Sequence, residues 1–565
     1  MVWQKLLIQR CKFKVMNRKP EDESFPASCL FFVVDWMEIG YNKKKRRRRM
    51  NYLNTKTPLI LYQKALNNKI YVDKSMLIEK VSEKIGTGES YLCITRPRRF
   101  GKTINANMLG AYYVKGYDSQ PLFANLKVAK ADTCLKHMNQ HHVIYMDLSR
   151  TPDICMSYQD FIEDIMKGIK EDLEEVYPDL RKKEYSRLAK MFQDTGDSFI
   201  FILDEWDAIF YKKFMTQGDK DSYLGFLKGL LKDQPYVELA YMTGVLPITK
   251  YSSGSELNMF REYNFMNDRT YEEYFGLNEA EVKALCKEHT GVSYEELEQW
   301  YNGYYLSDGR RLFNPRSVNC ALSDGYCRNY WTETGPMNEI ADCIEHNVKE
   351  VREDIVKMVA GIPVEVDLQG YGAFELQLDT RDEILSAMVV YGFLSYYDGD
   401  LRIPNYELME KFQRVLSRDS MGEVKEIVER SREMLEATLA CDEKKVASIL
   451  EDVHDKEIPF LNYNDENALS CVITLCYLYA RNDYKIEREA KSGKGYCDYL
   501  FLPKKKGKPA VILELKVQDS CEGAISQIKE KNYLQKAAEY KEVLLVGINY
   551  DKKKHHECRI ERWSN

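Results

Sequence analysis

Three consecutive residues, Gly101, Lys102 and Thr103, are of the types that hold the phosphates of a nucleotide. They close the stretch TRPRRFGKT, between an apolar run of strand type and a helical pattern. Gly101 lets the backbone approach a phosphate, Lys102 would reach the β- and γ-phosphates, and Thr103 would ligate Mg²⁺. Backbone N–H groups at the start of the helix, with the helix dipole behind them, favour the same anion. Arg96 replaces the usual first glycine, so this stretch alone leaves a basic turn as the alternative.

Two carboxylates follow another apolar run. Phe199–Leu203 leads directly into Asp204 and Glu205, at the carboxyl end of a predicted strand. Asp204 suits Mg²⁺ binding through water, and Glu205 suits the orientation of an attacking water. Thr243 ends a further apolar run, where it would sense the γ-phosphate or be an ordinary strand-end hydroxyl. Strand, GKT and helix followed by a strand and an Asp–Glu pair predict a nucleotide site with ATP and Mg²⁺ as cofactors.

A second acidic group lies near the C-terminus, at Asp498 and in the sequence ELK at Glu514–Lys516. Alternate residues of a strand share a face, so Glu514 and Lys516 point the same way. If KKKGK at 504–508 forms a hairpin loop, Asp498 stands opposite Glu514, with Cβ atoms roughly 5 Å apart. Carboxylates this close favour a divalent cation such as Mg²⁺, and Lys516 would stabilise a hydroxide or the scissile phosphate. The alternative is the solvent face of an ordinary hairpin.

The secondary-structure elements that must position these residues are strands and helices that alternate along the chain. A helix is expected over Tyr71–Ile85, with Asp73 near its N-cap. Strands separated by helical stretches predict an α/β domain with a parallel sheet covered on both faces. Residues 270–440 are mostly helical in pattern, and beyond them helices precede a strand pair, a helix (Cys521–Tyr540) and a last strand. The expected N-terminal strands are Tyr91–Thr95, Val143–Ser149, Phe199–Asp207 and Leu239–Val245.

The motifs YVDKS (Tyr71–Ser75), ITRPRRFGKT (Ile94–Thr103) and LDEWD (Leu203–Asp207) resemble those of the predicted AAA-ATPase-like family. The resemblance implies a P-loop NTPase domain and makes an arginine in place of the first glycine part of the family's pattern. Family-like motifs run from about residue 55 to 335 and include NPRS at Asn314–Ser317. AAA-type enzymes commonly act in rings, so a homo-oligomer is one expectation. Three loop arginines would add cationic donors to the phosphates or form a solvated basic turn: Arg96, Arg98 and Arg99.

The C-terminal pattern resembles the PD-(D/E)XK nuclease superfamily, over roughly residues 455–550. SGKGYCDYLFL at Ser492–Leu502 is similar to a segment of the nuclease-like domain often fused to this ATPase. Glu466 and Gln527 also match that pattern, whereas Tyr496 and Cys497 replace an Arg and an Ala and put a phosphate contact in doubt. The resemblance implies a catalytic and metal-binding set made of Asp498, Glu514, Lys516 and Gln527.

Together these features predict four segments and two candidate functions. The segments are a disordered basic extension (1–49), an AAA-ATPase-like P-loop domain (50–270), a helical lid or connector (271–440) and a nuclease-like domain (441–565). The first function is ATP hydrolysis coupled to metal-dependent cleavage of nucleic acid. The alternative is an ATP-dependent switch or scaffold whose nuclease-like domain binds nucleic acid or a partner without cleaving.

The composition of the chain limits which ligands, partners and compartments are expected for it. The 565-residue chain has a net charge of −6, so it has no global basic field for nucleic acid. Its 15 cysteines form no CxxC pair and its 8 histidines are scattered, which disfavours zinc and fits a reducing cytoplasm. No apolar run reaches the roughly 18–20 residues of a membrane helix. KKKRRRR at Lys43–Arg49 would be a nuclear-localisation or nucleic-acid arm, but a disordered or untranslated extension is favoured because Met50 opens a patterned segment.

Overall fold

The structure is a computed structural model. It describes residues 50–131, 135–248, 257–265, 268–331, 349–366, 368, 380–416, 423–454, 466–492, 495–504, 507–551 and 555–564. The predicted basic extension and its KKKRRRR run lie outside these residues. Within the described part, no helix combines the length and apolar character that a membrane crossing requires.

The N-terminal part is built on a five-stranded parallel sheet in the order β2-β3-β4-β1-β5. This confirms the predicted α/β class and the parallel arrangement. β1 and β3, whose ends carry the two predicted halves of the nucleotide site, are separated by β4 alone. The strands are β1 (Tyr91–Thr95), β2 (His142–Asp147), β3 (Phe199–Asp204), β4 (Val237–Gly244) and β5 (Arg261–Tyr263).

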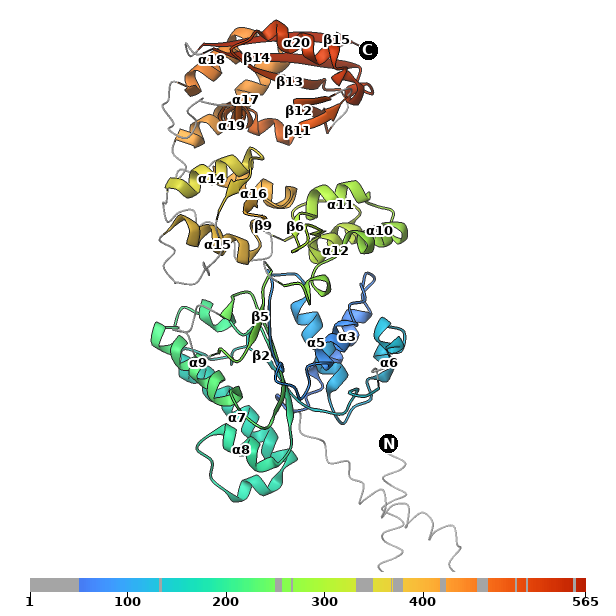
Figure 1. Ribbon diagram of the computed structural model, residues 1–565, viewed down its shortest axis with the longest axis vertical. Coiled ribbons are helices and arrows are strands. Elements are labelled where there is room, and N and C mark those ends of the chain that lie inside the picture. The colour runs from blue at the N-terminus through green and yellow to red at the C-terminus, as the bar shows by residue number, and fades with distance from the viewer. Residues whose placement is uncertain are drawn as a thin grey trace, which may run out of the picture. The chain divides into compact units, whose positions relative to one another are not determined.

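Helices cover both faces of this sheet (Figure 1). One face packs on α3, α4 and α5, where Tyr62, Leu109 and Ile202 belong to one buried cluster. The other face carries α7, α8 and α9, and there Phe192 of α8 packs on Phe201 of β3. The helices are α3 (Thr57–Leu66), α4 (Leu77–Ser82), α5 (Lys102–Tyr113), α6 (Gln120–Phe123), α7 (Tyr158–Val176), α8 (Leu188–Thr195) and α9 (Gln217–Leu231).

The helix expected over Tyr71–Ile85 is shorter than predicted. Only Leu77–Ser82 forms α4, because the Asp73 carboxylate acts ahead of the helix rather than at its cap. One oxygen accepts a hydrogen bond from the Ser75 N–H at 2.8 Å, and the other accepts from the distant Lys127 N–H at 2.6 Å. This second bond holds the preceding segment against another part of the domain, which local periodicity does not reveal.

The following segment is mainly helical, as predicted for 271–440, with two small sheets. The described part of the chain from Asn51 onward forms one compact unit, so the boundaries at 270 and 440 stay predictions. The helices are α10 (Glu279–Glu288), α11 (Tyr294–Tyr301), α12 (Pro315–Asp324), α14 (Lys349–Val359), α15 (Arg381–Tyr391), α16 (Tyr406–Leu416) and α17 (Glu423–Leu439). The strands are β6 (Tyr304–Tyr305), β7 (Arg311–Leu312), β8 (Val364–Glu365), β9 (Ser395–Tyr397) and β10 (Asp400–Arg402).

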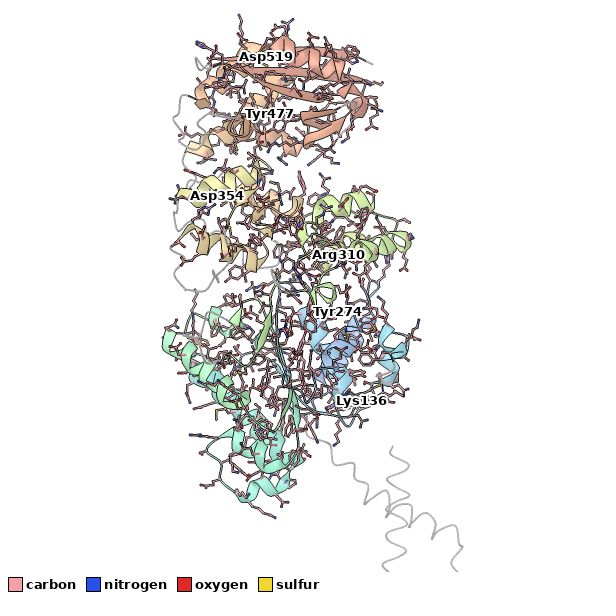
Figure 2. All side chains as sticks on the ribbon, in the orientation of Figure 1. Lys136, Tyr274, Arg310, Asp354, Tyr477 and Asp519 are labelled. Atoms are coloured by element: carbon pink, nitrogen blue, oxygen red, sulfur yellow. The ribbon has the colours of Figure 1, made fainter. Side chains whose placement is uncertain are left out.

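The C-terminal part has a mixed sheet in the order β11-β12-β13-β14-β15, in which only β13 and β14 are parallel. α20 connects these two strands and packs on one face, while α17, α18 and α19 cover the other. There Tyr477, which is labelled in Figure 2, is buried, and its hydroxyl lies 2.7 Å from Thr438 Oγ1. The elements are α18 (Glu443–His454), α19 (Glu466–Cys476), β11 (Tyr484–Ser492), β12 (Gly495–Pro503), β13 (Ala510–Val517), α20 (Cys521–Glu530), β14 (Glu542–Tyr550) and β15 (His556–Ser564).

Candidate nucleotide and metal sites

The loop after β1 forms a helix N-terminus that is open to an anion. Gly101 takes φ +91°, a left-handed conformation that glycine adopts without cost, and α5 begins at the next residue. No side chain caps this end, so the first-turn N–H groups are available to a ligand. The helix dipole adds partial positive charge at the same point. The geometry therefore suits a bound phosphate.

Lys102 is folded back onto its own loop. Its ammonium group donates to the carbonyl oxygens of Arg96 and Pro97, at 2.9 and 3.0 Å. Burial lowers the pKa of Lys102 to about 8, although the carboxylates of Asp207, Glu205 and Asp204 oppose that effect. The ammonium group thus lies among the acidic residues of the neighbouring strand ends, within the fold of the loop.

Asp204 is a fully buried carboxylate with one oxygen unused. Its Oδ1 accepts a hydrogen bond from Thr243 Oγ1 at 2.6 Å, whereas Oδ2 has no hydrogen-bond partner in the described structure. Burial raises the pKa of Asp204 to about 6, opposed by the hydroxyls of Thr243 and Thr103. A buried oxygen of this kind is costly unless a donor or a cation binds it. Its position beside Thr103 fits Mg²⁺, which binds through one or two carboxylates and keeps several waters.

Glu205 follows directly and has a strained backbone, with φ +52°. A left-handed conformation costs a non-glycine residue about 1–2 kcal/mol, and such strain is common at functional sites. Its side chain is partly exposed, in contrast to the buried Asp204. Asp207, also in the LDEWD motif, accepts the backbone N–H groups of Val245 and Leu246 instead, and so fixes the end of β4.

Arg96 does not take the role expected of it. Its side chain is 1% exposed and forms an ion pair with the buried Asp268. The guanidinium group also donates to the carbonyl oxygens of Thr95 and Tyr263, both at 2.8 Å. Arg96 thus joins the base of the loop to the segment after β5, so the expectation that it would donate to the phosphates is not supported.

The other two loop arginines are placed differently. The Arg98 guanidinium carbon lies 5.5 Å from the centre of the Tyr211 ring, a cation–π contact. Arg99 takes φ +74°, and its pKa is lowered by burial and by the neighbouring charge of Arg316. Glu205 opposes this shift, so Arg99 lies near the end of β3.

The C-terminal site has the register predicted from the sequence. Tyr499, Leu500 and Phe501 pair with Leu513, Ile512 and Val511, and the same register sets Asp498 opposite Glu514. The Asp498 N–H donates to Glu514 Oε2 at 3.4 Å. In return, the Leu515 N–H donates to Asp498 Oδ2 at 2.6 Å. The two carboxylates therefore meet across adjacent strands.

Lys516 and Gln527 complete this cluster. The Lys516 ammonium group donates to Gln527 Oε1 at 2.7 Å and lies 3.6 Å from Glu514 Oε1. The Gln527 amide nitrogen in turn donates to Glu514 Oε1. Burial, and then the charge of Asp498, raise the pKa of Glu514 to about 7, opposed by Lys516. A carboxylate that stays partly protonated near neutral pH beside another carboxylate is relieved when a cation binds.

The cation would use few protein ligands. No group of three or more His, Cys, Asp or Glu side chains that would hold a metal occurs among the described residues. Two carboxylates with water in the remaining positions are a set that Mg²⁺ accepts. The side chain of Glu466 and that of Tyr496 lie outside the described residues. Cys497 is buried, and burial raises its pKa to about 12, as expected of a core thiol.

Comparison with family models assigns both domains. Residues 63–253 match the family described as predicted AAA-ATPase, and residues 464–560 match the PD-(D/E)XK nuclease superfamily. The chain therefore carries an AAA-ATPase-like region at 63–253 and a PD-(D/E)XK superfamily region at 464–560. The loop and the end of β3 fall within the first match, and the Asp498–Glu514 cluster falls within the second.

Other comparisons are weaker. No curated protein matches the chain. A Walker-type ATPase of Pyrococcus abyssi is 14% identical, over 60% of this chain and 94% of that chain, with a TM-score of 0.31. The ORC2 protein of Aeropyrum pernix, in ADPNP–ADP complexes, is 10% identical, over 62% of this chain and 98% of that chain, with a TM-score of 0.29.

Arg316 belongs near the AAA-ATPase-like site and was not predicted there. The Gly276 N–H donates to the Phe100 carbonyl at 3.3 Å, and Leu277 pairs with Phe313, which brings the start of α12 to the loop. Arg316 Nε is buried and has no hydrogen-bond partner in the described structure. The NPRS motif was visible in the sequence, but only the tertiary pairing relates it to the loop.

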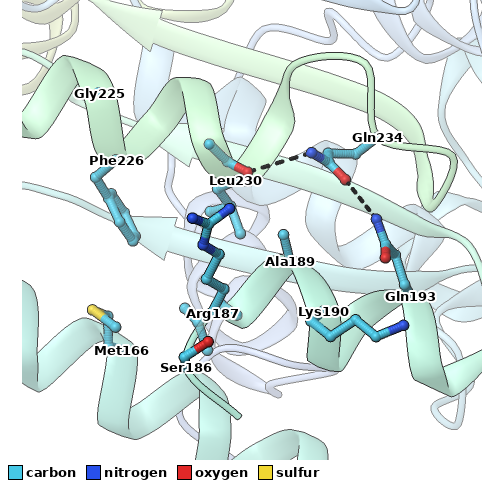
Figure 3. A pocket seen from close by; sticks show the side chains of 12 residues that line it. Met166, Ser186, Arg187, Ala189, Lys190, Gln193, Gly225, Phe226, Leu230 and Gln234 are labelled. Atoms are coloured by element: carbon cyan, nitrogen blue, oxygen red, sulfur yellow. Dashed lines mark hydrogen bonds between the residues drawn. The ribbon is translucent and has the colours of Figure 1, made fainter.

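A surface pocket of about 680 Å³ lies elsewhere in the AAA-ATPase-like domain (Figure 3). Arg187 and Lys190 border it at α8, and Gly225 and Gly229 border it at α9. These helix segments precede β3 and β4, so the pocket lies toward the amino ends of the strands. Parallel α/β sheets bind ligands at the carboxyl ends. We therefore assign this pocket no part in nucleotide chemistry.

Proposed function

We propose that this protein binds and hydrolyses ATP with Mg²⁺ at the loop of Gly101–Thr103. The observation that carries the proposal is the buried Oδ2 of Asp204 beside Thr103, next to the N-terminus of α5. Among the described residues, that oxygen has no hydrogen-bond partner and that helix end has no side-chain cap. Burying such an oxygen is costly unless a donor or a cation binds it. Mg²⁺ held by Thr103 and Asp204 would neutralise charge on the β- and γ-phosphates.

Other groups of the protein would bind the phosphates, orient the attacking water and position the Asp204 carboxylate. The first-turn N–H groups would bind the phosphates, and Lys102 would leave its loop carbonyls to reach the β- and γ-phosphates. Glu205, partly exposed at the strand end, would orient the attacking water. Arg99 and Arg316 would approach the anion from the loop and from α12. Thr243, which donates to Asp204, would hold the carboxylate in position.

Hydrolysis is tested by measuring the phosphate that purified protein releases from ATP. Lys102→Ala should abolish nucleotide binding or turnover, and Glu205→Gln should slow turnover while leaving binding intact. These two outcomes separate the binding role from the water-orienting role. Unchanged turnover in Lys102→Ala would show that the ATPase activity resides elsewhere or in a contaminant.

For the C-terminal domain we propose metal-dependent cleavage of nucleic acid. The supporting observation is the assembled set of Asp498, Glu514, Lys516 and Gln527, with the pKa of Glu514 raised to about 7. The two carboxylates would hold Mg²⁺, which supplies a hydroxide at neutral pH. Lys516 would stabilise charge on the scissile phosphate, and Gln527 would fix the positions of Lys516 and Glu514.

A switch or scaffold without cleavage is the second candidate. It is favoured by the net charge of −6, which gives no general attraction to nucleic acid. Plasmid DNA and single-stranded RNA incubated with protein and Mg²⁺ or Mn²⁺ discriminate between the two. Cleavage lost in Lys516→Ala supports the nuclease, cleavage unaffected by that change indicates contamination, and no cleavage with either metal favours the switch.

A further inference from the structure

A second pocket, of about 470 Å³, lies between α16, α17 and the end of β12. We call it the Arg481 pocket. Its volume falls within the roughly 300–1,000 Å³ of small-molecule sites. It belongs neither to the loop of Gly101–Thr103 nor to the cluster around Asp498. It is lined by Tyr406, Glu410, Gln413, Arg414, Val428, Glu429, Ser431, Arg432, Leu478, Tyr479, Arg481 and Lys504.

The lining is rich in cations. Of its four basic side chains, Arg432 already pairs with Glu436, outside the lining, at 2.8 Å. The other three, Arg414, Arg481 and Lys504, share the lining with two carboxylates, Glu410 and Glu429. Glu429 already lies 3.5 Å from Lys425, outside the pocket lining, so it contributes little to neutralising the wall. Burial raises the pKa of Glu410, and the charges of Arg414 and Lys504 oppose that shift. In the described structure, Glu410 is therefore the only carboxylate of the lining whose charge offsets those two cations.

Arg481 has no counter-ion among the residues that the structure describes. Burial lowers its pKa, and no carboxylate among the described residues forms an ion pair with it. In the described part of the chain its guanidinium group forms no hydrogen bond or ion pair, while its carbonyl oxygen accepts a hydrogen bond from Lys504. A partly buried cation without a counter-ion is costly. An anion in the pocket would remove that cost.

Lys504 holds a second donor beside Arg481. Its ammonium group donates to the Arg481 carbonyl at 2.7 Å and to the Tyr406 hydroxyl at 3.1 Å. An ammonium group has three donors, so one stays available for a ligand. Tyr479 is 37% exposed at the rim, and the Arg432 guanidinium lies 5.7 Å from its ring centre. An exposed ring beside guanidinium groups is a surface on which a nucleobase stacks.

We infer that the Arg481 pocket binds the phosphate group of a nucleotide or of a nucleic-acid strand. Guanidinium and ammonium donors together match a phosphate, and the neighbouring ring suits its base. The pocket is lined by residues of α16, of α17 and of the end of β12, which is the strand that carries Asp498. Binding there does not depend on ATP hydrolysis or on cleavage.

The test is acetylation of Lys504 in the full-length protein, followed by mass spectrometry, with chelator present to prevent cleavage. The probes are inorganic phosphate, AMP and a short DNA strand without terminal phosphates. AMP lacks the β- and γ-phosphates that the loop of Gly101–Thr103 would hold. Protection by AMP or phosphate assigns the ligand as a free nucleotide, and protection by the strand alone assigns it as nucleic acid. No protection by any probe overturns the inference.

Binding of the protecting probe is then measured in two matched variants. Arg481→Gln should weaken it by roughly tenfold or more, because a charged hydrogen bond is lost. Arg187→Gln removes the same charge at the other pocket and should leave binding unchanged. Equal affinity in the two variants also overturns the inference. If Arg481→Gln does not fold, Lys504→Gln carries the comparison, since that side chain is exposed.

Discussion

Asp204→Asn should make the protein more stable and inactive at once. The native carboxylate is 0% exposed, and burial raises its pKa from the ordinary 3.8 to about 6. A shift of about two units corresponds to roughly 3 kcal/mol of cost to the folded state near pH 7. Asparagine keeps an acceptor for the Thr243 hydroxyl and carries no charge. Its amide group would have no assured partner, which costs about 1 kcal/mol.

The net gain is therefore about 2 kcal/mol near pH 7. If the segment that matches the first family unfolds by itself, as a unit of roughly 200 residues, this raises its melting temperature by about 4–8 °C. The sign depends on pH. Because the folded pKa of Asp204 lies above the unfolded one, the cost is present above about pH 6 and disappears below about pH 4. The advantage of Asp204→Asn should disappear over the same interval.

Thermal unfolding with and without Mg²⁺ and ATP measures both effects. The ligand should stabilise the wild type but not the variant, since the site for the cation is lost. Asp207→Ala is the control and should destabilise, because it removes the acceptor of the Val245 and Leu246 N–H groups and leaves them without a partner. A variant at Asp204 that melts below the wild type, or that Mg²⁺ and ATP stabilise equally, would refute this reasoning.

Three further predictions concern charge at the two sites. Since burial lowers the pKa of Lys102 to about 8, ATP binding near pH 8.5 should take up about three quarters of a proton. Calorimetry in buffers of different ionisation enthalpy should show this uptake in the wild type and not in Lys102→Met. Because the pKa of Glu514 is about 7, Mn²⁺ affinity should fall below about pH 7, approaching tenfold per unit, and equal affinity at about pH 5.5 and 8 would contradict it. Arg316→Gln should weaken ATP binding by roughly tenfold, whereas Arg310→Gln, whose guanidinium pairs with a neighbouring acid at the surface, should not.

Local sequence predicted which polar residues the structure brings close together at the two candidate sites. A strand followed by GKT, and a strand followed by Asp204–Glu205, predicted one nucleotide site, and both strands lie in the same sheet, separated by β4. The register of Asp498 against Glu514 followed from the period of a strand and from the length of one hairpin loop. Period and loop length are local properties, so distant parts of the chain do not alter them.

The features that the sequence did not reveal depend on contacts between residues that lie far apart along the chain. Arg96 was expected to donate to the phosphates because local sequence does not reveal its true partner, Asp268, which lies 172 positions away. Arg316 was overlooked for the same reason, since the pairing of Leu277 with Phe313 brings it to the loop. Asp73 likewise bonds to Lys127 rather than capping the helix predicted at Tyr71. In each case a contact between distant parts of the chain decides where the polar side chain lies.

The decisive experiment is calorimetric titration of purified wild-type protein and Lys102→Ala with ATP and Mg²⁺. If the triphosphate lies at Gly101–Thr103 with its cation at Asp204, the wild type binds one equivalent and the variant binds at least tenfold more weakly. Identical binding curves for the two proteins, or no heat from either, would contradict the assignment.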